Sequence, residues 1–218
     1  MWAELKAFWE RNKKFPQQSF PAGCVSSLVA QLPVLIISSR FGLEIAGQLA
    51  LTLKIMAAPV GLLGRAVQDV FKRQAAIDLA NFGNCSVIYL KMLIALSLGA
   101  ILFISAIVGF GEVLFVLVFG IEWQQAGVFA VLMSPASALG FMASPLSCLI
   151  FIVRRQELDL AWQIVLFLTT FLSLSIAENA VHALIAYSFM YSAMYVLYLW
   201  ITFRLSLGGG LFKPATKS

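Results

Sequence analysis

Two positively charged residues lie in an apolar stretch that is long enough to cross a membrane. Segment 45–71 contains Lys54 and Arg65 as its only cations. They are eleven residues apart, so a helix would present both on one face, roughly 16 Å apart. A charge inside a bilayer is costly and usually faces a cavity, a partner or a transported ion. Because a desolvated phosphate gains charge-assisted hydrogen bonds from such cations, the pair predicts a site for an anionic ligand.

Structural alternatives stay open for each polar residue at membrane depth. Lys54 lies about nine residues, or roughly 13 Å, from the outer end of its span, so its long stem could also snorkel outward. Arg65 has Asp69 one helical turn later as a pairing partner. Gln31 and Gln48 either line the same cavity as the cations or hold helices together by hydrogen bonds.

The composition indicates an all-α integral membrane protein. Hydrophobic residues make up 61% of the chain and charged residues 11%, against roughly 45–50% and about 25% in a soluble domain. The formal net charge of +5 does not indicate nucleic-acid binding, because the cations lie at the ends of apolar runs and form no basic stripe with aromatic residues between them.

Six segments are predicted to cross the membrane as helices. They are 23–39, 45–71, 87–110, 126–153, 160–177 and 181–203. This divides the chain into a cytosolic amphipathic lead-in (1–22), a six-helix membrane lobe (23–204) and a cytosolic tail (205–218). The apolar segment 111–125 is too short to cross, so we expect a short helix at the outer interface with Trp123 among the headgroups.

The charges between the spans predict the orientation. One side of the predicted topology carries nearly all the cations and the other carries Arg40 with several glutamates. The positive-inside rule therefore places both termini of this multi-pass protein in the cytosol. The cations of the inner side are Lys6, Arg11, Lys13, Lys14, Lys72, Arg73, Lys91, Arg154, Arg155, Arg204, Lys213 and Lys217.

Prolines recur inside the predicted spans and are candidate hinges. Pro33, Pro59, Pro135 and Pro145 each remove a backbone hydrogen bond and tend to kink a helix. Small residues accompany them and permit close helix contact, although simple packing explains such residues as well. Kinked helices lined by small residues are also typical of moving transporter lobes. The small residues are Ala57, Gly61, Gly64, Ala136, Gly140 and Ser144.

Sequence signatures of enzymes and metal sites are nearly absent. The chain has no phosphate-binding Gly-Lys-Ser/Thr loop, no Gly-x-Ser-x-Gly elbow and no His-Glu-x-x-His. We therefore expect no catalytic residue, no cofactor and no metal. Cys24, Cys85 and Cys148 fit no metal-ligand spacing and are expected to be reduced. The single histidine, His182, lies at an outer span edge, where an interfacial position and a proton relay are both open.

Two stretches resemble polysaccharide flippases of the multidrug/oligosaccharidyl-lipid/polysaccharide exporter superfamily. The first is similar in its Leu32-Pro33 span, the Phe41-Gly42 turn, Gly47, the cation Lys54 and Pro59. The second is similar to the family's Phe-Gly-x-Glu-Trp-x-x-Ala-Gly segment and a later Pro-Leu with a basic turn. Its matching residues are Phe119, Gly120, Glu122, Trp123, Ala126, Gly127, Pro145, Leu146, Arg154 and Arg155. The likeness covers about 25–170 well and the last two spans by hydropathy alone.

This resemblance implies a transporter of the bacterial inner membrane that flips an undecaprenyl-pyrophosphate-linked oligosaccharide of the O-antigen type by alternating access. Such proteins have two six-helix lobes around a central cavity, and this chain resembles the C-terminal lobe alone, so its implied partners are the lipid-linked sugar, membrane lipids and a missing lobe or second copy. Two alternatives stay open, a multidrug or cation antiporter lobe of the same superfamily and a non-transporting scaffold subunit of a polysaccharide assembly complex.

Overall fold

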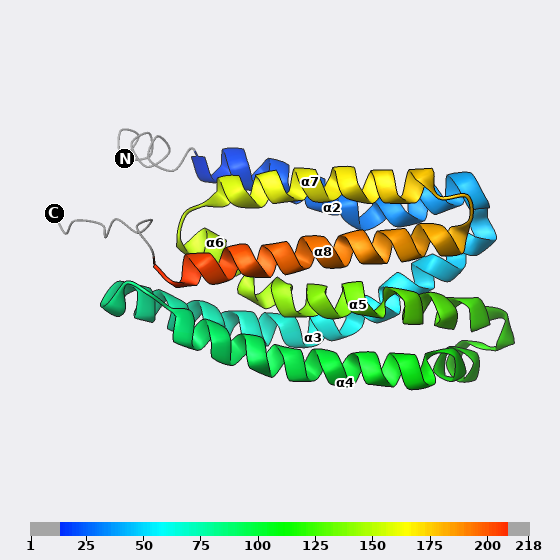
Figure 1. Cartoon of the computed structure of the whole chain (residues 1–218), viewed down its shortest axis with the longest axis horizontal. Coiled ribbons are helices and arrows are strands. Elements are labelled where there is room, and N and C mark those ends of the chain that lie inside the picture. Colours follow the sequence, from blue (N-terminus) through cyan, green and yellow to red (C-terminus); the bar gives the residue numbers. More distant parts are fainter. Residues whose placement is uncertain (1–13, 209–218) are drawn as a thin grey trace, which may run out of the picture.

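The computed structural model describes residues 14–208, with the side chains of 14–20, 22, 59, 60 and 62 outside the description. This part of the chain is helical and has no strand. Consecutive long helices run in opposite directions along the bundle (Figure 1). The elements are α2 (Lys14–Phe41), α3 (Leu43–Phe82), α4 (Ser86–Phe119), the 3-10 turn η1 (Ile121–Trp123), α5 (Gln124–Leu146), α6 (Cys148–Ile152), α7 (Gln156–Ile176) and α8 (Ala180–Ser206).

Short connections end the helices and force the chain to turn back. α3 ends at Gly83, which has φ 71° and whose N–H donates to the carbonyl of Leu79 at 3.1 Å. Glycine suits this left-handed position because it has no Cβ. α8 begins after Asn179, whose side chain accepts a hydrogen bond from the N–H of His182 at 2.8 Å. The connection between α7 and α8 is therefore a tight one, over residues 177–179.

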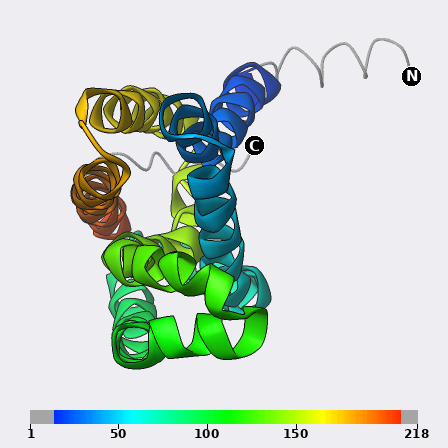
Figure 2. The ribbon, with the colours of Figure 1, turned by 90° about the vertical axis from the view of Figure 1, so that its right-hand side faces the viewer.

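Helix α5 is the centre of the bundle. In the span Ile121–Ile152, which holds α5 and α6, 56% of the most apolar window is buried, against 17% in the span of α4. α5 packs against α3, α4 and α8, while α2 packs against α7 and α3. Seen from its end, the bundle has α2 and α7 on one side and α4 on the other, with α5 between them (Figure 2). The exposed apolar surface of α4 suits contact with lipid.

The helices account for the predicted spans. Five helical segments are long and apolar enough to cross a membrane, and α3 makes a sixth if its two bent parts count as one span. Leu43–Ala58 and Leu63–Phe82 meet at an angle of 42°. α3 runs well past the predicted end at residue 71. The predicted division into lead-in, lobe and tail stays a prediction, because residues 1–13 and 209–218 lie outside the described part.

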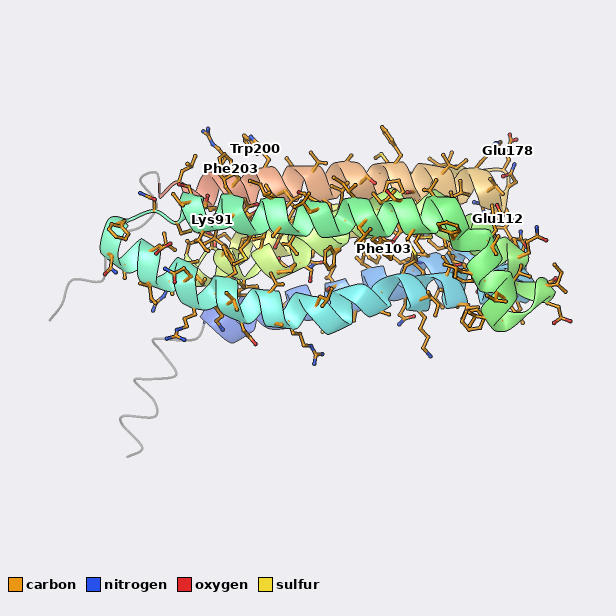
Figure 3. The ribbon with its side chains drawn as sticks, turned by 90° about the horizontal axis from the view of Figure 1, so that it is seen from below. Lys91, Phe103, Glu112, Glu178, Trp200 and Phe203 are labelled. Carbon is orange, nitrogen blue, oxygen red and sulfur yellow. The ribbon has the colours of Figure 1, made fainter. Side chains whose placement is uncertain are left out.

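The segment 111–125 differs from the expected separate helix. Its first part continues α4 as far as Phe119, and η1 then leads directly into α5. The continuous helix nevertheless turns at Glu112, so that its end lies across the end of the bundle (Figures 2 and 3). The backbone hydrogen bonds of α4 thus continue through this turn, where the sequence predicts the start of a separate short helix.

Charge is divided between the two ends of the bundle. Lys91 lies toward the end where the described chain begins and finishes, and Glu112 and Glu178 lie at the opposite end (Figures 1 and 3). The connections between α3 and α4 and between α6 and α7 share the end of Lys91 (Figure 1). This is the arrangement on which the predicted cytosolic placement of both termini depends.

Candidate functional site

A groove of about 440 Å³ lies between α3, α5 and α8. Its α8 wall is a row of tyrosines, Tyr187, Tyr191 and Tyr195, spaced one helical turn apart. Successive ring centroids are 5.1 and 4.8 Å apart. The hydroxyls of Tyr191 and Tyr195 are 3.3 Å apart and share a hydrogen bond. This wall offers both aromatic surface and hydroxyl groups to a ligand.

Small residues of α5 leave room in front of the tyrosines. Ala136, Ser137, Gly140 and Ser144 line the groove. A Cβ on Gly140 would lie 3.7 Å from the ring of Tyr195, in ordinary contact. The small residues predicted from the sequence for this span therefore border a groove as well as a packed interface.

The third wall comes from α3 and brings the groove close to the two candidate cations. Leu53, Met56, Ala57 and Gly61 line it. Lys54 and Arg65 are both exposed. At about 100° per residue, Lys54 lies roughly 20° and Arg65 roughly 40° from Gly61 around the helix, apart from the bend of α3. Neither cation lines the groove. By this spacing both lie beside the Gly61 edge of the α3 face that does.

Neither cation is held by a carboxylate within residues 14–208. Arg65 forms no ion pair there with Asp69, the partner that its spacing offered, and Lys54 has no acidic neighbour within ion-pair distance in that range. Their exposed ammonium and guanidinium groups can therefore meet a ligand or a second protein. The bend of 42° in α3 falls between the two cations and sets their relative direction.

Gln48 has a structural role. It is 9% exposed. Its amide nitrogen donates to the carbonyl of Glu122 at 2.6 Å, and its amide oxygen accepts from the N–H of Ala126 at 3.1 Å. The Thr52 hydroxyl adds a bond to the Ala126 carbonyl at 2.8 Å. These contacts join α3 to the start of α5, whereas Gln31 is exposed on α2, and neither glutamine lines the groove.

The predicted hinge prolines differ in their surroundings. Pro33 and Pro145 are buried and Pro135 is exposed. Pro135 cannot donate to the carbonyl of Val131, and the hydroxyl of Ser134 does so instead at 2.8 Å. α5 ends at Leu146, directly after Pro145. The side chain of Pro59 lies outside the described residues, although the bend in α3 falls between Ala58 and Leu63.

A buried carboxylate on α7 was not expected from the sequence. Asp159 is 9% exposed and accepts a hydrogen bond from the hydroxyl of Tyr198 at 3.1 Å. The sequence places it at a span edge, but that describes its position along the helix and not its direction. Its helical register is the sequence feature that indicates burial. Asp159 falls on the same helix face as the other buried residues of α7, which include Trp162, Leu166, Thr170 and Ser173.

Comparison with known proteins adds no relative. No family model, curated protein or solved structure matches the chain. The described residues contain no group of three or more His, Cys, Asp or Glu side chains that could hold a metal ion. His182 is exposed beside Asn179, at the start of α8.

Proposed function

We propose that this chain is one lobe of a membrane transporter that moves a lipid-pyrophosphate-linked oligosaccharide across the inner membrane of a bacterium. In this proposal Lys54 and Arg65 attract the pyrophosphate at the rim of the groove. The observation that supports it best is that both cations are exposed on α3, beside the edge of the face that lines the groove. Two exposed cations near a concave surface suit a doubly charged anion.

The groove suits the rest of such a ligand. Tyrosine hydroxyls and the hydroxyls of Ser137 and Ser144 are hydrogen-bonding groups that a sugar can use. Aromatic faces and the apolar residues Leu53 and Met56 lie beside them. Ligand sites commonly combine a mostly apolar lining with a few polar groups that set orientation. We expect the headgroup to contact the α8 wall while the lipid tail stays outside the groove.

A second lobe would complete the site. The groove is open rather than enclosed, so alternating access requires another body to close over it. A second copy of this chain or a separate lobe would serve equally in the proposal. With the cation-rich end of the bundle in the cytosol, both termini lie inside and the groove runs along the direction of transport.

The test is the Lys54→Ala variant, made in a transporter that contains both lobes. We expect expression and membrane insertion to be retained and flipping to fall by at least about tenfold, because the charge-assisted contact with the pyrophosphate is lost. Export is followed by the amount of surface polysaccharide. Lys91→Ala is the matched control, since Lys91 is also an exposed lysine but lies on α4. Normal surface polysaccharide in Lys54→Ala would contradict the proposal.

One observation favours the antiporter alternative. The buried carboxylate of Asp159 is the kind of group that a cation or drug antiporter uses at its transport site. This alternative predicts that Asp159→Asn abolishes export of cationic compounds while Lys54→Ala does not. The flippase proposal predicts that Lys54→Ala lowers export of the lipid-linked sugar and that Asp159→Asn does not.

A further inference from the structure

A second cavity, of about 330 Å³, lies between α2, α5, α7 and α8 and contains Asp159. Within residues 14–208, the carboxylate accepts one hydrogen bond, from Tyr198 to its Oδ1. Arg155, four residues before Asp159, pairs with Glu157 and not with Asp159. A buried carboxylate without a cation from the described chain favours a positively charged ligand.

Aromatic rings indicate which kind of cation fits. The Trp162 ring centroid is 4.4 Å from that of Tyr198 and 5.2 Å from that of Tyr195, and all three residues line the cavity. A carboxylate with aromatic side chains is the combination that binds organic ammonium groups. A bare metal ion would need several oxygens at about 2.0–2.6 Å. A cavity of about 330 Å³ with one carboxylate is too large and too poor in charge for that.

The position of the cavity points to a lipid headgroup. Asp159 is three residues from the start of α7, where the apolar span begins. Gly23 and Ser26, near the start of the α2 span, line the same cavity. Arg154, exposed in the turn before α7, supplies a positive charge at this end. The ends of spans lie at headgroup level, where a phosphate and an ammonium group are present together.

We propose that this cavity binds the ammonium group of a zwitterionic phospholipid, phosphatidylethanolamine being the probe of choice. Asp159 holds the ammonium, and the rings of Trp162 and Tyr198 form its wall. Arg154 is outside the cavity lining, in the turn before α7, and would supply a positive charge for the phosphate. The cavity shares Ser144 and Tyr195 with the groove but includes neither cation of α3, and the proposed lipid binding does not depend on transport. Binding requires no covalent step and leaves both lipid and protein unchanged.

Lipid retention in nanodiscs tests the site. The protein is placed in nanodiscs made of equal parts of phosphatidylglycerol and phosphatidylethanolamine. Native mass spectrometry then counts the lipids of each kind that stay bound when the protein is released from the disc. We expect the wild type to retain phosphatidylethanolamine preferentially. Asp159→Asn should lower that retention about tenfold, because the neutral amide loses the charge-assisted contact but still accepts from Tyr198. Asp78→Asn makes the same charge change on α3 and should retain lipid normally.

A second variant covers a failure of Asp159→Asn to fold. Ser26→Phe narrows the cavity from an exposed position of α2 and should reduce retention to a similar extent. Equal retention of the two lipids by the wild type, or wild-type retention in both variants, would overturn the proposal. A third outcome would also overturn the proposal. If free ethanolamine bound only when Asp159 is present, while the wild type showed no preference between the two lipids, the ligand would be a soluble cation.

Discussion

At the scale of single residues, polar side chains of the bundle divide into those that hold helices together and those that form no hydrogen bond with another helix in the described part of the chain. Arg40 donates to the carbonyls of Leu174 and Ala177 at 2.6 and 2.8 Å. It thereby satisfies carbonyls at the end of α7, where a positive charge is also favoured by the helix dipole. Lys54 and Arg65 make no such contact within the described residues. The difference between these cations is what separates a structural arginine from a candidate site.

Gln48 provides the sharpest test of the structural group. Gln48→Met should keep the volume but leave the Glu122 carbonyl and the Ala126 N–H without their partner. We expect a lower melting temperature in detergent and a loss of about 1–2 kcal/mol in the free energy of unfolding. Gln31→Met, at an exposed position, is the control and should be nearly neutral. A neutral Gln48→Met would show that these hydrogen bonds are replaced within the bundle.

The cysteines predict a pattern of reactivity. Burial, together with the charges of Asp78 and Cys148, raises the pKa of the Cys85 thiol to about 12. The thiol is therefore protonated at pH 7 to 8 and is a poor nucleophile. In variants with a single cysteine, we expect maleimide to leave Cys85 unlabelled until the protein is unfolded, while the exposed Cys24 reacts in the folded state. Rapid labelling of folded Cys85 would contradict its burial.

At the scale of elements, the contact between α4 and α5 depends on a glycine. A Cβ placed on Gly127 would lie 2.6 Å from the Cα of Glu112, so the two backbones meet where α4 turns. This approach allows the end of α4 to lie across the bundle. Gly111, also buried, borders the same contact.

Gly127→Ala should therefore push the two helices apart. We expect a destabilisation of about 1–3 kcal/mol or more, seen as a lower melting temperature, because backbone atoms cannot move aside as a flexible side chain would. Gly47→Ala is the matched control, since nothing lies within 4 Å of the added Cβ. That control should be neutral or slightly stabilising, because alanine is the better helix former. Equal melting of the two variants would contradict the close approach.

At the scale of the whole molecule, the spans and their alternation could be predicted from the sequence. Apolar length and the distribution of cations depend on local composition, which a single chain displays directly. The packing could not be predicted in the same way. Asp159 lies at a span edge along the chain, yet it points inward because α7 places it in register with Trp162 and Leu166. Direction around a helix becomes meaningful only when its neighbours are known.

The candidate site was likewise partly predictable. The spacing of Lys54 and Arg65 predicts a shared face, and both side chains are exposed. The groove beside α3 depends on α5 and α8. The four-residue spacing of Tyr187, Tyr191 and Tyr195 is visible in the sequence, but it does not show that they face a groove. Gln48 could not be assigned, because its partners Glu122 and Ala126 are more than seventy residues away in the chain.

The central claim is that residue 54 faces water inside the membrane. Its most direct test is thiol labelling of a cysteine placed at this position. Lys54→Cys is made in a background where Cys24, Cys85 and Cys148 are replaced, and native membranes are treated with a negatively charged, membrane-impermeant thiol reagent. Leu98→Cys, at an exposed apolar position of α4, is the control for contact with lipid. We predict that Lys54→Cys is labelled and the control is not. Equal protection of both positions would place the side chain of residue 54 among lipid tails and contradict the account.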